Sequence, residues 1–383
     1  MSSTIETLFR AGSLVIAATT LVACGGPITS ADGGCPDGAP SWVCRALDGS
    51  TDPDATTVVD VPVPDASVCP QPSDASVPEG DYVPLIVGEY YRAYTPEGTN
   101  YLNDHTLFRD PTTCRWNLVG ITAETLGTPS QETAFIHATA DNLLGPWTQD
   151  SRPALEVDAT LDESLLWAPY VFENGDRHLT MLYEGGWRGD PPPREIRRAD
   201  FVTDHWVRQE SATGVAPAFR VPGGRDPFAL HLENGSWLVY SVGVRQTPMG
   251  NYGQILVTSI ADLDVPSNVE SAATSVAIED PAPVANPFNW GNLESPFVVR
   301  FGGKFYLFLT RTGVGHTDYV RTLVFRSTDP LHFEWDAITT LFSHAAEIVR
   351  DRDRWFITSA GWTSEVGDAN RGLLVAPLAW AQK

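Results

Sequence analysis

The sequence predicts an all-β fold, a five-bladed β-propeller preceded by a signal peptide and a disordered acidic linker. Two observations predict the propeller. No long stretch of the 383 residues has the apolar periodicity of a helix, and one unit recurs five times. The unit has a short apolar strand, a turn with Gly, Asn or Asp, and a second strand that begins with an aromatic ring. Each hairpin is followed by a further strand-like run, so each copy supplies about four strands, as a propeller blade does.

The five copies follow one another along the chain at similar intervals. Their first strands start at Asp104, Ala168, Asp226, Ser295 and Ala345, which are 64, 58, 69 and 50 residues apart. A β-sandwich also has short strands and frequent turns, but five copies in the same phase favour the propeller. We therefore expect a single propeller domain over residues 83–383.

Residues 1–23 have the pattern of a bacterial lipoprotein signal peptide. Arg10 precedes an apolar run, and the segment ends in Leu-Val-Ala before Cys24. The run is too short to span a bilayer but suits the core of a signal peptide. The ending resembles a lipobox, which implies a lipid on Cys24. Glycines follow that cysteine, and this implies a lipid-anchored protein of the outer membrane or cell surface in a Gram-negative host.

Residues 24–82 predict an acidic, disordered tether. The segment is rich in Pro, Asp and Ala, and up to Gly80 it has nine acidic residues against one basic residue, Arg45. Such a composition buries too little apolar surface to offset the entropy of ordering. If Cys24 carries lipid, four cysteines remain, and four can pair in three ways. Cys35 with Cys44 is the local pair, and Cys69 with Cys114 would attach the end of the tether to the first blade.

The charge balance limits the classes of ligand. There are 48 acidic residues against 25 basic ones, a net charge of -23 at pH 7. Such a chain repels nucleic acids, anionic lipids and anionic polysaccharides, and no basic stripe offsets this. We expect a neutral or cationic ligand, no nucleic-acid partner, and contact with a membrane only through the lipid anchor.

The phase of the repeat predicts the position of the site. If the first strand of each copy is innermost, its leading residues surround the mouth of the central channel. The aligned pairs are Asn103-Asp104, Trp167-Ala168, Arg225-Asp226, Glu294-Ser295 and His344-Ala345. Three carboxylates, Asp104, Asp226 and Glu294, then come from three blades into one cavity. Asp110-Pro111 repeats the Asp-Pro sequence but falls at a hairpin tip, and we interpret it as a turn.

Glycoside hydrolysis needs this set of groups. One carboxylic acid protonates the leaving oxygen, and a second carboxylate attacks the sugar or activates water. A third carboxylate raises the pKa of the acid by repulsion and can bind sugar hydroxyls. For a single acid at the start of a strand, a turn cap or a solvated residue is the ordinary explanation. Three acids in the same phase favour catalysis.

The same residues resemble a known superfamily. Asn103-Asp104, Arg225-Asp226-Pro-Phe and Glu294-Ser-Pro-Phe are similar to the motifs of the arabinanases, levansucrases and invertases, glycoside hydrolase families 32, 43 and 68. Trp167-Ala-Pro and His344-Ala-Ala-Glu add to this likeness, which covers the whole propeller. The resemblance implies that Asp104 is the nucleophile or general base, Asp226 stabilises the transition state, and Glu294 is the general acid.

Four further residues are candidates for binding substrate. Asn103 precedes Asp104, and Trp167 has the right phase to stack on a sugar. Arg225 would bind hydroxyls or hold Asp226 through a charge-assisted hydrogen bond. His344 has the phase of the glutamate. No cofactor and no metal site are expected. In some family 43 enzymes a histidine in the channel helps to position a metal ion, so an ion near His344 is the alternative.

These observations predict a glycosidase acting on terminal furanosides, or similar residues, of neutral oligosaccharides. The Asn103-Asp104 pair resembles family 32, which implies retention of anomeric configuration, although His105 stands where that family has proline. The alternative within enzymes is an inverting arabinofuranosidase or xylosidase of the family 43 kind. The alternative outside enzymes is a non-catalytic sugar-binding surface lipoprotein.

Overall fold

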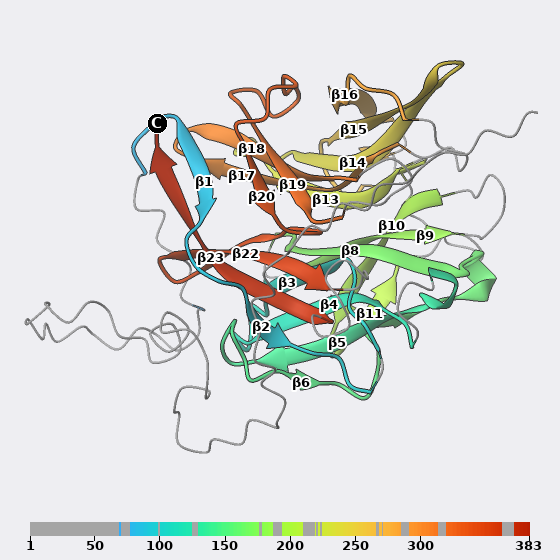
Figure 1. The fold of residues 1–383 in the computed structure, drawn as a ribbon. Coiled ribbons are helices and arrows are strands. Elements are labelled where there is room, and N and C mark those ends of the chain that lie inside the picture. The colour runs from blue at the N-terminus through green and yellow to red at the C-terminus, as the bar shows by residue number, and fades with distance from the viewer. Residues whose placement is uncertain are drawn as a thin grey trace, which may run out of the picture.

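Five antiparallel sheets surround a central axis, as the sequence predicts (Figure 1). The computed structural model describes residues 69, 77–98, 100–124, 129–175, 178–186, 194–209, 219, 221–222, 224–265, 268–269, 271–284, 291–312, 319–361 and 371–383. In each sheet the first strand of the predicted hairpin is innermost and the second strand pairs with it. The prediction of an all-β, five-bladed propeller is confirmed.

The strands are grouped into blades in the order of the chain. Blade 1 contains β3 (His105–Arg109), β4 (Trp116–Thr122), β5 (Ala134–Ala140), β6 (Thr148–Gln149) and β7 (Leu155–Glu156). Blade 2 contains β8 (Leu165–Glu173), β9 (Leu179–Gly186), β10 (Arg194–Val202), β11 (His205–Arg208) and β12 (Val221–Pro222). Blade 3 contains β13 (Arg225–His231), β14 (Trp237–Thr247), β15 (Gly250–Ile260) and β16 (Ala273–Glu279). Blade 4 contains β17 (Leu293–Phe301), β18 (Lys304–Arg311), β19 (Arg321–Ser327) and β20 (Thr339–Phe342).

Blade 5 joins the two ends of the propeller. It contains β21 (Ile348–Asp351), β22 (Arg354–Gly361), β23 (Gly372–Gln382), β1 (Tyr82–Ile86) and β2 (Tyr91–Tyr94). β1 pairs antiparallel with β23, from Tyr82 opposite Gln382 to Ile86 opposite Leu378. Figure 1 shows β1 in blue beside β23 in red. The N-terminal strand thus completes the last blade and closes the ring.

The hydrophobic core lies between the blades. Five clusters of buried residues occur in the described part of the chain, and each draws on two neighbouring blades. Near the axis, the rings of Tyr170 and Phe297 both pack on Phe228, each with centroids 4.6 Å from it. This packing fixes the inner strands of blades 2, 3 and 4 against one another. η1 (Pro129–Gln131) and η2 (Ala159–Leu161) are single 3-10 turns, and no described helix is long and apolar enough to cross a membrane.

The inner strands share a backbone feature at the predicted phase. Ala168, Asp226, Ser295 and Ala345 all have left-handed backbones, with φ of 45°, 52°, 50° and 47°. In blades 2, 3 and 4 the pairing of the inner strand with its neighbour also shifts by one residue at this point. Such a β-bulge turns two successive side chains toward the same side. In blades 2, 3 and 4 the bulge therefore lets both residues of the aligned pair approach the channel.

One disulfide joins the N-terminal segment to blade 1. Cys69 is bonded to Cys114 in the β3–β4 hairpin, which confirms that predicted pair. Cys24, Cys35 and Cys44 lie outside the described residues. Asp110 lies in the same hairpin, and its Oδ1 accepts hydrogen bonds from the amides of Thr112 and Thr113 at 2.7 and 3.1 Å. Asp110 is thus a turn residue, as predicted.

Candidate active site

The start of the inner strands presents side chains to the channel in successive rings. The mouth ring contains Asn103, Trp167, Arg225, Glu294 and His344. The aspartate ring contains Asp104, Ala168, Asp226, Ser295 and Ala345. Two residues further along, the floor ring contains Thr106, Tyr170, Phe228, Phe297 and Glu347.

A small cavity fills the channel between the aspartate ring and the floor ring. Asp104, Asp226, Tyr170, Phe297 and Glu347 are among its lining residues, and no mouth-ring residue lines it. Its volume of about 40 Å³ has room for a few water molecules but not for a sugar ring. A sugar in contact with the carboxylates must therefore lie on the side of the mouth ring.

Arg225 connects two of the predicted carboxylates. Its Nη1 lies 3.1 Å from Oδ2 of Asp226, and its Nη2 lies 3.3 Å from Oε1 of Glu294. Nη2 also donates to the carbonyl of Leu293 at 3.0 Å. Burial lowers the pKa of Arg225, but the charges of Asp226, Glu294 and Glu184 outweigh this and raise it. Arg225 therefore keeps its charge and holds the carboxylates of blades 3 and 4 together.

Ser295 connects the two aspartates. Its backbone amide donates to Oδ2 of Asp226 at 3.0 Å, and its hydroxyl lies 3.4 Å from Oδ1 of Asp104. Asp226 is thus held by one backbone donor and one guanidinium, which favours its ionised form. The three carboxylates that the sequence analysis placed in one cavity are brought together by these contacts.

The pKa of Asp104 is raised by its surroundings. Burial is the main cause, and the charges of Asp226, Glu294 and Glu132 add to it, while Arg225 opposes them. The pKa of Asp104 lies well above the ordinary carboxyl value. Asp104 therefore holds a proton more firmly than an exposed carboxyl does. The expectation that repulsion raises the pKa of the general acid Glu294 stays a prediction.

The two histidines of the channel are neutral at pH 7. Burial lowers the pKa of His344 to about 4, although the charge of Glu294 opposes this. Burial and the neighbouring His344 lower the pKa of His105 to about 3. Nε2 of His105 lies 2.8 Å from Oγ1 of Thr358 on β22. His105 therefore links blade 1 to blade 5.

The other two predicted binding residues lie in the mouth ring. Asn103 is buried, and its backbone amide donates to the carbonyl of Ile121 at 3.0 Å. Trp167 is partly buried and packs on the core cluster between blades 1 and 2. Trp167 therefore contributes to the core between these blades.

Three site residues were missed by the sequence analysis, and a fourth, Glu347, was noted there only as part of a motif. Glu184 lies opposite Trp167 in the β8–β9 pair and is buried, and its charge raises the pKa of Arg225. Glu132 is buried and accepts a 2.6 Å hydrogen bond from the hydroxyl of Tyr101, and its charge raises the pKa of Asp104. Tyr319 contacts His344, and Glu347 lies in the channel floor.

Glu347 is a buried acid on the inner strand of blade 5. Its Oε2 accepts a 2.8 Å hydrogen bond from the amide of Leu107 on blade 1. Burial raises its pKa to about 8, although the bonds from Leu107 and Thr106 lower it. Glu347 is therefore mostly protonated at pH 7 and joins blade 5 to blade 1.

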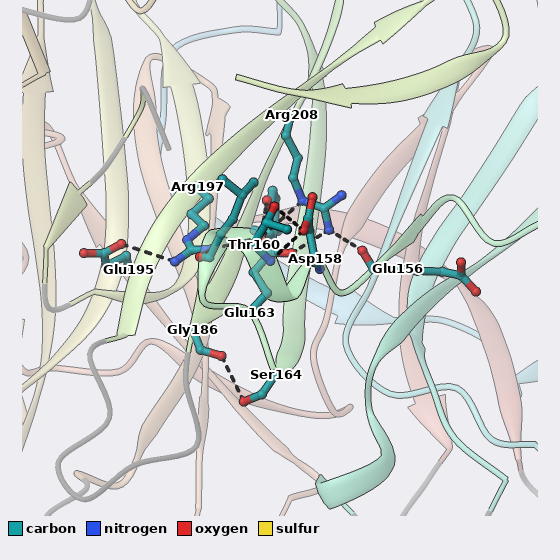
Figure 2. A network of polar contacts seen from close by, with 11 residues as sticks. Glu156, Asp158, Thr160, Glu163, Ser164, Gly186, Glu195, Arg197 and Arg208 are labelled. Carbon is teal, nitrogen blue, oxygen red and sulfur yellow. Dashed lines mark hydrogen bonds and ion pairs between the residues drawn. The ribbon is translucent and has the colours of Figure 1, made fainter. Parts of the chain in front are cut away.

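A buried ion cluster fixes the segment that leads into β8 (Figure 2). Oε1 of Glu163 lies 3.1 Å from Nη1 of Arg197 and accepts a 2.8 Å hydrogen bond from the hydroxyl of Tyr183. Arg208 contacts the second oxygen of Glu163, which also accepts from the amide of Asp158. The side chain of Glu163 is 0% exposed and that of Arg197 is 4% exposed, so the centre of the cluster is out of water. It fixes the start of β8, because Glu163 lies two residues before Leu165, the first residue of that strand.

Within the described ranges, no group of three or more His, Cys, Asp or Glu side chains is placed to hold a metal ion. The ion considered near His344 stays a prediction.

Comparison with solved structures shows the same fold. A thermostable family-43 glycoside hydrolase matches with a TM-score of 0.52 and 16% identity, over 76% of this chain and 96% of that chain. An endo-1,4-beta-xylanase from Bacteroides thetaiotaomicron matches with 0.52 and 16%, over 77% and 97%. A levansucrase mutant from Bacillus subtilis matches with 0.53 and 10%, over 78% and 88%. No protein-family model and no curated protein sequence match the chain.

Proposed function

We propose that this protein is a glycoside hydrolase whose catalytic residues are Asp104, Asp226 and Glu294. The observation that supports this most is the pair of contacts from Arg225 to Asp226 and Glu294, which gathers carboxylates of two blades beside Asp104. A sugar-binding module has no need of three acids that repel one another. The likeness in fold to a family-43 glycoside hydrolase, a xylanase and a levansucrase is consistent with this function.

Each carboxylate has its own part in the proposed reaction. Glu294 protonates the oxygen of the leaving group. Asp226, held ionised by Arg225 and Ser295, stabilises the positive charge that develops on the sugar ring. Asp104 attacks the anomeric carbon, and Glu294 then activates water against the covalent intermediate, so that configuration is retained. Asp104 must lose its proton before it can attack.

The proposed substrate is a neutral oligosaccharide with a terminal furanoside or a similar residue. The net charge of -23 disfavours anionic polysaccharides. The small cavity below the aspartate ring leaves the mouth side for the sugar, which suits a ring that enters from outside.

The alternative is inversion, in which Asp104 acts as a general base on water. Retention needs the two reacting carboxyls about 5–5.5 Å apart, and inversion needs about 6.5–9.5 Å. The sequence of events also differs, because inversion forms no covalent intermediate. A nuclear magnetic resonance time course distinguishes them: the first anomer formed keeps the configuration of the substrate under retention and has the opposite one under inversion.

The test of the function is product analysis with the purified propeller and its N-terminal disulfide, on fructosides, arabinosides, xylosides and galactosides. We expect release of a terminal sugar from one class. Binding of a sugar without any hydrolysis, in the wild-type protein, would instead identify the non-catalytic sugar-binding alternative.

We also propose that the protein is exported and lipid-anchored at Cys24, on the outer membrane or cell surface. The lipobox-like end of residues 1–23 supports this. Cys24→Ser should abolish lipid labelling and membrane association. A variant that still partitions with membranes would refute the anchor.

A further inference from the structure

Tyr319 lies at the mouth of the channel on the side of blade 4. β18 runs back toward the mouth, because Glu294 near the start of β17 pairs with Thr310 near the end of β18. β19 begins at the same end, where Thr322 pairs with Thr310. Tyr319 lies two residues before Arg321, the first residue of β19, so it belongs to the connection at the mouth end of this blade.

Tyr319 is the most accessible member of a cluster with His344 and Glu294. Its ring meets that of His344 edge to face, with centroids 5.3 Å apart and 79° between the planes. His344 and Glu294 are mouth-ring residues of neighbouring blades and are 3% and 8% exposed. Tyr319 is only half-buried. A ligand that arrives at the mouth therefore meets Tyr319 before it reaches Glu294.

Among the three carboxylates of the site, Glu294 has the strongest electrostatic effect on Tyr319. Burial raises the pKa of Tyr319, and of the three carboxylates Glu294 raises it most, ahead of Asp104 and Asp226. The phenol therefore keeps its proton at physiological pH and can donate a hydrogen bond.

The position of Glu294 determines which part of the substrate lies beside Tyr319. If the proposed function holds, Glu294 protonates the oxygen of the leaving group. The sugar that reacts with Asp104 lies above the aspartate ring, because the cavity below is too small for it. A residue beside Glu294 and nearer to solvent then borders the leaving sugar, not the reacting one.

We infer that Tyr319 binds the leaving sugar of the oligosaccharide and contributes to specificity for it. A half-buried tyrosine suits this role, since its ring packs on the apolar face of a sugar and its hydroxyl bonds a sugar hydroxyl. This inference rests on the proposed glycosidase function and on the part of Glu294 in it.

The experiment compares two substrates with the same reacting sugar. One is an oligosaccharide with a sugar as leaving group, and the other is a glycosyl fluoride, whose leaving group is too small to touch Tyr319. Tyr319→Ala should lower kcat/KM for the oligosaccharide about tenfold or more, mainly through KM, and change the fluoride by less than about twofold. Tyr319→Phe should give an intermediate loss on the oligosaccharide, because it keeps the ring.

Phe201→Ala is the matched control. Phe201 is a half-buried aromatic residue on β10, at the end of blade 2 that is away from the channel mouth. Its loss should leave the ratio of kcat/KM for the two substrates unchanged. Equal losses of Tyr319→Ala on both substrates would mean that Tyr319 only supports the fold or the reacting sugar, and would overturn the inference. An unchanged KM for the oligosaccharide would overturn it too. A wild-type protein that hydrolyses neither substrate would refute the proposed function itself.

Discussion

The backbone amide of Ser295 donates a 3.0 Å hydrogen bond to Oδ2 of Asp226. Ser295 follows the proposed acid Glu294 on blade 4, and Asp226 belongs to blade 3. The left-handed backbone of Ser295 at φ 50° aims this amide at the channel while Glu294 stays in the mouth ring. One bulge therefore positions a carboxylate of its own blade and binds that of the neighbouring blade.

Asp226→Asn should lower kcat by about 10²–10³-fold with little change in stability. Asparagine keeps an oxygen for the amide of Ser295 but loses the charge that would stabilise the transition state. Asp110→Asn is the control, because Asp110 is the turn residue of the β3–β4 hairpin. Its kcat should stay close to that of the wild type. Similar losses at Asp110 and Asp226 would contradict the assignment by repeat phase.

Glu294→Gln should cost about 10²–10⁴ in rate with a natural sugar leaving group. The loss should be far smaller with an activated aryl leaving group, which needs little protonation. Steady-state kinetics on both substrates checks this. An equal loss on both would show that Glu294 is not the proton donor.

The acid limb of kcat/KM should lie well above pH 4. Asp104 must be ionised to react, and burial with its acidic neighbours raises its pKa. Activity therefore falls as the pH drops through that raised pKa. Because the charge of Arg225 lowers the pKa of Asp104, Arg225→Gln should move the limb to still higher pH. Arg225→Lys keeps the charge and should move it less. A limb near pH 4 in the wild type would refute the role of Asp104.

Glu347→Gln should abolish the part of the pH dependence of the unfolding free energy that comes from the proton on Glu347. Burial raises the folded pKa of Glu347 from 4.5 to about 8. Between these values the folded state binds a proton that the unfolded state has lost. This stabilisation is complete below pH 4.5 and is lost as the pH rises toward 8. Urea unfolding of wild type and variant over this range should differ in slope by about 1.4 kcal/mol per pH unit. Parallel pH profiles would mean that Glu347 does not bind this proton.

Glu163→Gln should destabilise the fold by about 3–5 kcal/mol, because it removes the buried carboxylate that Arg197 and Arg208 share. Asp141→Asn, in the exposed pair with Arg115, should cost less than about 1 kcal/mol. Urea unfolding measures both. Equal losses of unfolding free energy in the two variants would mean that burial does not determine how much the cluster stabilises the fold.

The repeat predicted the blades and the ring positions of Asp104, Asp226 and Glu294, because apolar hairpins with a common phase are a local property of the sequence. Glu184 was missed because its position depends on the bulge in β8. Residue pairs near the turn, such as Tyr170 with Leu182, would place Gly185 opposite Trp167 if the register continued unchanged. The shift brings Glu184 there instead. Knowledge of the bulge at Ala168 could have revealed it.

Other residues reach the site from segments that the repeat does not describe. Tyr319 belongs to a connection between β18 and β19, and Glu132 comes before β5. Their positions depend on contacts between distant parts of the chain, which no local pattern encodes. Glu347 was noted as part of a motif. Its burial beside the aromatic residues of the floor ring depends on how Tyr170, Phe228 and Phe297 pack on one another.

The disulfide between Cys69 and Cys114 attaches the N-terminal segment to the end of blade 1 that is opposite Asp104. Cys114 lies in the hairpin that follows the end of β3, whereas Asp104 immediately precedes the start of the same strand. The covalent attachment of the preceding chain is therefore on the back of the propeller. Under the proposed lipid anchor at Cys24, the chain that leads to the membrane is attached at this back face, and the channel mouth lies on the opposite face. Under the proposed glycosidase function, an oligosaccharide then reaches Glu294 from the face that is away from the membrane.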